Sequence, residues 1–215
     1  MKLIEAYHEI LTPITGKELK ELEQVARVCY KSEDRITDDG RSAEKLISML
    51  IKNGHEAMLE HKSLSVKFVC DRAISHELVR HRVASFAQES QRYCNYAKEK
   101  FNAEITFIRP WWLHEGDKGY DDFVKACQHA EDGYFDLLND GWYTENARGV
   151  LPNATKTEIV MTANYREWRH ILQLRCAIAA HVDMRHLMTG LCQELKQLIP
   201  IIFDDIKTYP PFKED

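Results

Sequence analysis

The sequence predicts an α+β fold, in the form of a single mixed domain with a small sheet and long C-terminal helices. Strand-like and helical periodicities are interspersed along the chain, without the strict alternation that is typical of parallel α/β proteins. A hydrophobic fraction of 44% and a charged fraction of 29% are ordinary for a globular chain of 215 residues with a full core. The chain contains no internal repeat or low-complexity linker, so we expect one domain over residues 1–208 and an acidic tail over 209–215.

The first half of the chain changes from one periodicity to the other several times. Residues 16–30 and 42–54 place apolar side chains three and four positions apart, which predicts two amphipathic helices. Residues 63–70 alternate apolar and polar side chains instead, which predicts a strand with one buried face. The elements expected here are, in order, a strand over 2–11, helices over 16–30 and 42–54, a strand over 63–70 and a helix over 72–82.

The second half contains longer helical stretches. A short strand over 104–108 ends before Pro110, because proline cannot continue a strand ladder. The C-terminal third is helical in pattern, and its one expected interruption is at Pro200. The remaining expected elements are a helix over 121–138, a turn at Gly141, a short helical segment up to Leu151, a strand over 157–162 and helical structure over 165–206.

Charge and cysteine content exclude several classes of protein. A formal net charge of -5 argues against general nucleic-acid binding, which uses a basic surface. The six cysteines form no Cys-x-x-Cys pair, so neither a zinc knuckle nor a redox dithiol is indicated. The first residues lack the apolar segment of a signal peptide, and no apolar run approaches the length of a membrane span. We therefore expect a cytoplasmic protein with reduced thiols.

The densest polar cluster is the sequence Arg80-His81-Arg82, followed after seven residues by Ser90 and then by Arg92. Guanidinium groups are planar donors suited to phosphates and polarised carbonyls. The cluster therefore indicates an anion-binding site. A solvated basic turn, whose arginines pair only with local carboxylates, is the alternative.

Metal and phosphate-loop motifs are not indicated. His76 and His81 resemble the zinc-binding His-Glu-x-x-His pair but are five positions apart, so on a helix their directions differ by about 140°. His55 and His61 are also too far apart to share one helical face. No glycine-rich phosphate loop is present, so side chains would have to bind any phosphate, and we expect no metal.

A second polar cluster lies in residues 164–170 and is followed by Arg175. On a helix, Arg166 and His170 are one turn apart on the same face. Arg175 lies instead near the ridge formed by Trp168, Ile171 and Leu172. One interpretation is a helix whose charged side chains are simply exposed. The other is a helix that lies between two bound anions, or between a ligand and another subunit.

These clusters together resemble the flavin-dependent thymidylate synthases, whose hallmark is Arg-His-Arg, seven residues and then Ser. Here the hallmark is complete, from Arg80 to Ser90. The similarity extends in the same order over roughly residues 20 to 190. The other segments that resemble the family are 27–30, 54–55, 60–61, 75–78, 147–155 and 164–175.

The resemblance implies an α+β homotetramer with active sites between subunits, which binds FAD, dUMP, methylenetetrahydrofolate and NADPH. It implies reductive methylation of dUMP to dTMP, in which NADPH reduces the flavin and the folate supplies the carbon. The positions that match flavin-binding residues of the family are Ala57, Arg80, His81, Arg82, Gln88, Asn164, Arg166 and His170.

The resemblance also assigns the nucleotide site. Arg175 matches the arginine thought to favour ionisation of the uracil ring and is therefore the expected catalytic residue. The positions that match dUMP-binding residues are Glu77, Leu78, Val79, Arg80, Gln88, Glu89, Ser90, Gln91, Arg92, Arg148 and Arg175.

Two positions depart from the family pattern. Ala57 stands where relatives usually carry a hydroxyl residue near the flavin, so only its backbone could replace that contact. Glu89 stands where an apolar residue is common, and a carboxylate beside an anion site weakens binding unless it points away or pairs with an arginine. Three alternatives stay open: a flavoenzyme that hydroxymethylates a pyrimidine nucleotide, a non-catalytic flavoprotein or RNA-binding module, and a histidine-based metal hydrolase.

Overall fold

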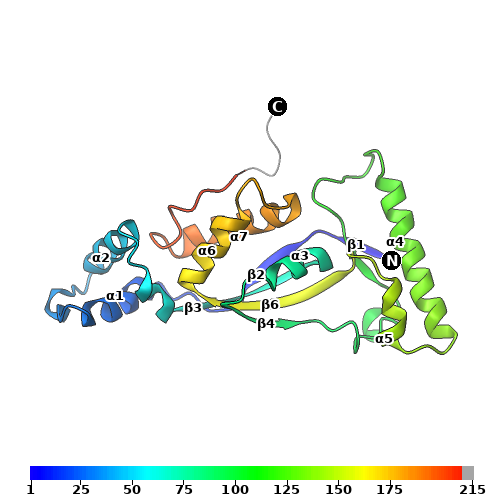
Figure 1. Ribbon diagram of the computed structural model, residues 1–215, viewed down its shortest axis with the longest axis horizontal. Coiled ribbons are helices and arrows are strands. Elements are labelled where there is room, and N and C mark those ends of the chain that lie inside the picture. The colour runs from blue at the N-terminus through cyan, green and yellow to red at the C-terminus, as the bar shows by residue number, and fades with distance from the viewer. Residues whose placement is uncertain (210–215) are drawn as a thin grey trace. The chain divides into compact units, whose positions relative to one another are not determined.

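A computed structural model of the chain describes residues 1–209, except for the side chain of Lys100 (Figure 1). Helices and strands are mixed without strict alternation, which confirms the predicted α+β class. Strand β1 (Lys2–Ile4) pairs in parallel with β5 (Thr106–Ile108) in a two-stranded sheet. A four-stranded sheet has the order β2-β3-β6-β4, formed by β2 (Tyr7–Ile10), β3 (Ser63–Asp71), β6 (Lys156–Asn164) and β4 (Ser85–Gln88).

The helices account for most of the remaining regular structure. The α-helices are α1 (Glu18–Val28), α2 (Arg41–Lys52), α3 (Arg72–Leu78), α4 (Tyr120–Asn139), α5 (Thr144–Ala147), α6 (Tyr165–Arg175) and α7 (Val182–Leu198). Short 3-10 turns are η1 (Glu33–Arg35), η2 (Ala57–His61), η3 (Glu99–Phe101) and η4 (Arg148–Val150).

Contacts divide the chain into two compact units. Unit 1 consists of Met1–His8, Lys67–His81 and Phe86–Val160. Unit 2 consists of Glu9–Val66, Arg82–Ser85 and the chain from Met161 onward. The domain boundary expected at residue 208 stays a prediction, and residues 210–215 of the expected tail lie outside the described residues.

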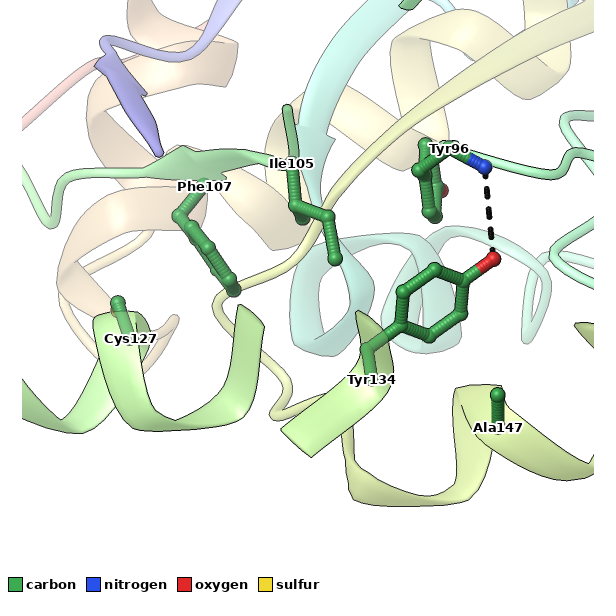
Figure 2. Close-up of a cluster of buried hydrophobic side chains, with 6 residues drawn as sticks. All are labelled: Tyr96, Ile105, Phe107, Cys127, Tyr134 and Ala147. Atoms are coloured by element: carbon green, nitrogen blue, oxygen red, sulfur yellow. Dashed lines mark hydrogen bonds between the residues drawn. The ribbon is translucent and has the colours of Figure 1, made fainter. Parts of the chain in front are cut away.

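Unit 1 has a core between α4 and the segments around β5 (Figure 2). Cys127 and Tyr134 are seven residues apart on α4, so both lie on the same face after two turns. The Tyr96 ring lies 5.6 Å from that of Tyr134, and the Tyr96 backbone N–H donates to the Tyr134 hydroxyl at 3.4 Å (Figure 2). This core fixes the chain that follows β4.

Unit 2 is organised around α6. Asn164 caps the helix, because its side-chain oxygen accepts the backbone N–H of Glu167 at 2.8 Å. Trp168 is fully buried, and its indole N–H donates to the carbonyl of Leu64 at 2.9 Å. The Tyr165 ring packs edge-on against Phe203. One face of α6 is therefore fixed in the core, which determines where its other faces point.

Several predicted elements differ from the structure. The strand expected over 2–11 is two strands, because the chain changes from one sheet to the other after Ile4. The helix expected over 72–82 ends at Leu78, so Arg80-His81-Arg82 follows the helix and the angle argument for His81 does not apply. Strand β4 was not predicted, since four residues are too short to show a period.

The helical stretch expected over 165–206 is also wrong in detail. It is interrupted between Arg175 and Val182, and no helix follows Leu198 among the described residues. The interruption is held by side chains, because Arg185 donates to the carbonyl of Ile178 at 2.7 Å and His181 accepts the N–H of Asp183 at 3.3 Å. Side-chain caps of this kind do not change the hydrophobic period that predicted one helix.

Candidate functional site

The first part of the hallmark motif lies in a turn at the end of α3, in unit 1. The backbone N–H groups of Arg80 and His81 donate to the carbonyls of Glu77 and Leu78 at 3.2 and 3.1 Å. Arg80 is exposed at this turn, whereas His81 is buried. Leu78, two residues before Arg80, is fully buried.

The loop of residues 88–94, which carries Ser90, is extensively hydrogen-bonded. Gln88 donates through Nε2 to Ser75 Oγ at 2.9 Å and to Thr157 Oγ1 at 3.2 Å. The Ser90 carbonyl accepts the backbone N–H groups of Tyr93 and Cys94 at 3.1 and 2.9 Å. Hydrogen bonds within the protein therefore hold the 88–94 loop in its conformation.

Two of the expected nucleotide-binding arginines meet at Glu145. Arg92 Nε donates to the Glu145 carboxylate at 2.7 Å, and Arg148 Nε donates to the Glu145 carbonyl at 3.2 Å. The backbone N–H of Arg92 also donates to Ser90 Oγ at 3.3 Å. Ser90, Arg92 and Arg148, the expected phosphate-binding residues, are thus linked by hydrogen bonds, in part through Glu145. Arg92 and Glu145 are half-exposed, so a phosphate can replace the carboxylate at low cost.

Glu89 does not add an unpaired charge to this group. Its carboxylate pairs with Lys156 at 2.9 Å, and the Tyr96 hydroxyl donates to it at 3.4 Å. Lys156 also pairs with Glu158 at 2.8 Å. Burial disfavours the ammonium, but hydrogen bonds to Glu158 and Glu89 outweigh burial and raise the pKa of Lys156. The Glu89 carboxylate is therefore paired, with a lysine rather than with the expected arginine.

Unit 2 contains a cavity of about 520 Å³ beside α6, here called the α6 cavity. Asn164, Arg166 and His170, three of the expected flavin-binding residues, line it together. Asn164 lies here because it caps the helix, and the other two because they are one turn apart. The other lining residues are Glu56, Glu60, Val83, Glu167 and Gln173.

A larger cavity of about 850 Å³ lies between α1, α2 and η2, here called the α1–α2 cavity. It shares Glu56 and Arg166 with the α6 cavity, and Ala57 is part of its lining. The lining is largely apolar, with Val25, Ala26, Leu46, Met49, Leu50 and Met58. The more polar residues of the lining are Arg27, Cys29, Tyr30, Ser32, Arg35, Gly54, His55 and His61.

The two arginines at the start of α6 have different surroundings. Arg166 is half-exposed at the two cavities and forms an ion pair with Glu60. Arg169 is buried, donates from Nε to Glu56 at 3.0 Å and forms two hydrogen bonds with Asp205 at 2.6 and 2.8 Å. Burial disfavours its charge, but Asp205 and Glu56 outweigh burial and raise the pKa of Arg169.

The remaining expected site residues are dispersed. Arg82 is exposed in unit 2, and Arg175 is the half-buried last residue of α6. Glu77 is half-buried in α3, Val79 follows the helix at the surface, and Gln91 is half-buried in the 88–94 loop. The structure thus places one group of expected residues in each unit.

Sequence reasoning missed some residues of the cavities. Glu56 lines both cavities and Glu60 lines one, although neither was assigned a role. His55, His61 and Tyr30 carried the family resemblance without an assignment, and the structure gathers them in the α1–α2 cavity. The signal available in the sequence was that Glu60 lies in the resembling segment 60–61 and Glu56 directly follows the segment 54–55.

Membrane-spanning helices and disulfides are both absent from residues 1–209. Within residues 1–209, no helix is long and apolar enough to cross a membrane. All six cysteines lie within the same range as thiols, and none is in a disulfide.

A family model described as "Thymidylate synthase complementing protein" matches residues 11–201. The chain belongs to this family. A flavin-dependent thymidylate synthase from Geobacter sulfurreducens is 36% identical over 185 residues, which cover 84% of this chain and 78% of the relative. Another from Corynebacterium aurimucosum is 34% identical and covers 86% of this chain and 78% of its own.

Two solved structures share the fold of this chain. The crystal structure of a UMP/dUMP methylase, PolB, from Streptomyces cacaoi bound with 5-Br dUMP has a TM-score of 0.77 and 26% identity, and the match covers 95% of this chain and 96% of that one. Thymidylate Synthase X from Helicobacter pylori, solved with FAD and dUMP, has a TM-score of 0.73 and 23% identity over 94% and 98% of the two chains, so it supports the fold alone.

Proposed function

We propose that this protein is a flavin-dependent thymidylate synthase that methylates dUMP to dTMP, with FAD as its redox cofactor. The observation that carries the proposal is the α6 cavity, which is lined by three residues that match flavin-binding positions of the family. Family membership and relatives of 36% and 34% identity that are named for this activity support it.

The chemistry of the two cavities fits FAD. Arg166 supplies a half-exposed cation for the diphosphate, and Asn164 and His170 supply polar groups beside it. The α1–α2 cavity supplies apolar surface for a planar ring, and Ala57 can contribute only its backbone and a methyl group there. When bound and reduced, FAD supplies the hydride that completes the methyl group.

The nucleotide phosphate belongs at Ser90, Arg92 and Arg148. A dianion needs several paired cations to leave water, and these residues already form one hydrogen-bonded group. Arg80 stands exposed at the end of α3, close in the chain to Glu77 and Val79, which we also assign to the nucleotide site. Arg175 stabilises negative charge that develops on the uracil ring, which is the charge that lowers the barrier.

The remaining parts of the proposal rest on family resemblance. Methylenetetrahydrofolate supplies the carbon and NADPH the electrons, and the enzyme is a homotetramer. Six cysteines without a disulfide among the described residues support a cytoplasmic location.

A second candidate substrate is UMP, because the structural neighbour from Streptomyces cacaoi is named a UMP/dUMP methylase at 26% identity. The two nucleotides differ only by a ribose hydroxyl. Relative turnover of equal concentrations of the two therefore measures the preference directly.

The test is to incubate the protein anaerobically with FAD, NADPH, methylenetetrahydrofolate and dUMP, and to determine the mass of the nucleotide product. A product heavier than dUMP by one methylene unit is expected. A hydroxymethyl product would transfer the protein to the alternative flavoenzyme class, and unchanged dUMP with every component present would reject the proposal.

A further inference from the structure

Lys156 lies at the first position of β6 and contacts the 88–94 loop from the side opposite Gln88. On β6, the side chains of Lys156 and Glu158 point to one face of the strand and that of Thr157 to the other. Gln88 bonds Thr157, whereas Glu89 bonds Lys156. Consecutive residues of the loop are thus held by opposite faces of the same strand.

The backbone and the side chain of Glu89 both bond to neighbouring residues, which hold it toward the face of β6 that carries Lys156. Its backbone N–H donates to the Glu158 carbonyl at 2.8 Å, and its carboxylate is largely buried between Lys156 and Tyr96. Tyr96 is itself held by Tyr134 in the core of unit 1 (Figure 2). Rotating the carboxylate out of this position would therefore break its bonds to Lys156 and Tyr96.

We propose that Lys156 is a positioning residue for nucleotide binding, which acts by pairing the Glu89 carboxylate and holding it away from the phosphate site at Ser90. The inference rests on the proposed function, since it concerns the dUMP site. Glu89 adjoins Ser90 in the chain, so an unpaired carboxylate there would repel a phosphate dianion. Lys156 acts through Glu89 and need not contact the nucleotide.

The test is a double-mutant cycle on dUMP affinity, measured by calorimetry on the full chain supplied with FAD. Lys156→Met should raise the Kd for dUMP about tenfold, the size expected for one unit charge about 10 Å from an anion in a partly buried setting. Glu89→Gln in the Lys156→Met background should restore the Kd to within about threefold of wild type. Lys125→Met, which changes an exposed lysine of α4, is the matched control and should leave the Kd unchanged.

A purely structural role would give a different pattern. If the double variant binds dUMP as weakly as Lys156→Met, Lys156 acts by packing or by its own charge, and the inference is overturned. The electrostatic mechanism also requires the loss in Lys156→Met to shrink in about 0.5 M salt, whereas a packing defect would persist. Melting temperatures show whether each variant is folded. If Lys156→Met is unfolded, and adding Glu89→Leu does not restore folding, the inference is also overturned.

The wild-type titration separates this inference from the proposed function. Wild-type protein that binds no dUMP contradicts the proposed function and the inference with it. Wild-type protein that binds dUMP, with no rescue by Glu89→Gln, contradicts the inference alone.

Discussion

The two faces of α6 use arginine for opposite purposes. Arg169 is 3% exposed, and its guanidinium is surrounded by Glu56, Asp205 and the carbonyl of Ile202. Arg166, three residues earlier, is 52% exposed, faces two cavities and has one exposed partner in Glu60. Arg169 is held by contacts within the protein, whereas Arg166 can exchange the Glu60 carboxylate for a ligand.

Burial therefore distinguishes an arginine that is fixed in the protein from one that remains accessible to a ligand. A buried guanidinium cannot lose its partners without leaving a charge in a low-dielectric interior. An exposed ion pair contributes little to stability, so replacing the carboxylate with a phosphate has a small cost.

The largest expected effect is on stability. Arg169→Met should lower the free energy of unfolding by about 3–5 kcal/mol, because Glu56 and Asp205 lose their shared cation. Thermal and denaturant unfolding measure this loss. Arg41→Met, which removes an exposed pair with Asp39, is the control and should cost less than about 1 kcal/mol. Equal losses in the two variants would contradict the structural role of Arg169.

At the end of the same helix, Arg175→Ala should reduce turnover about 10²-fold or more at saturating dUMP, while FAD stays bound. The reason is that its charge matters most when negative charge develops on the ring. Single-turnover kinetics with reduced enzyme measure the effect. Turnover like that of the wild type would remove Arg175 from the catalytic assignment.

On the exposed face, Arg166→Ala should weaken FAD binding about 10- to 100-fold, the loss of one charge-assisted contact to a phosphate. The melting temperature without FAD should hardly change, since the Glu60 pair is exposed. Titration by flavin fluorescence measures the affinity. If stability falls and FAD affinity does not, the assignments of Arg166 and Arg169 are reversed.

The smallest expected effect is a pH dependence from Asp205. Its hydrogen bonds with Arg169 outweigh burial and hold the pKa of the carboxyl below its usual value of 3.8. As pH falls, Asp205 therefore binds a proton in the unfolded state before it does so in the folded state. The stabilisation is present above the unfolded pKa and is lost as pH falls through the folded pKa. Asp205→Asn should flatten the acid limb of the melting temperature below about pH 4. An unchanged acid limb would show that the pair does not contribute.

The sequence predicted the parts of the fold that depend on local periodicity. The helices near α1, α2 and α4 and the strand β3 begin and end within a few residues of the expected positions, because each buries one apolar face. It could not predict the end of α3 at Leu78 or the break before Val182, since caps and long-range contacts decide these.

The candidate site shows the same limit. The motif residues Asn164, Arg166 and His170 could be grouped in advance, because one helical turn relates two of them and the third caps the helix. The sequence could not decide whether the Arg169 side chain is exposed or contacts a bound anion. Its burial depends on Asp205, which is 36 residues away in the chain. The partner of Glu89 was equally hidden, because Lys156 is 67 residues distant.

The most direct test of the account is an absorbance spectrum of the purified protein with added FAD, recorded anaerobically before and after NADPH and then dUMP with methylenetetrahydrofolate. The proposed function predicts bound-flavin absorbance bands that bleach with NADPH and return when nucleotide and folate are added. A protein that takes up no FAD would contradict it and would leave Arg166 as an ordinary surface cation.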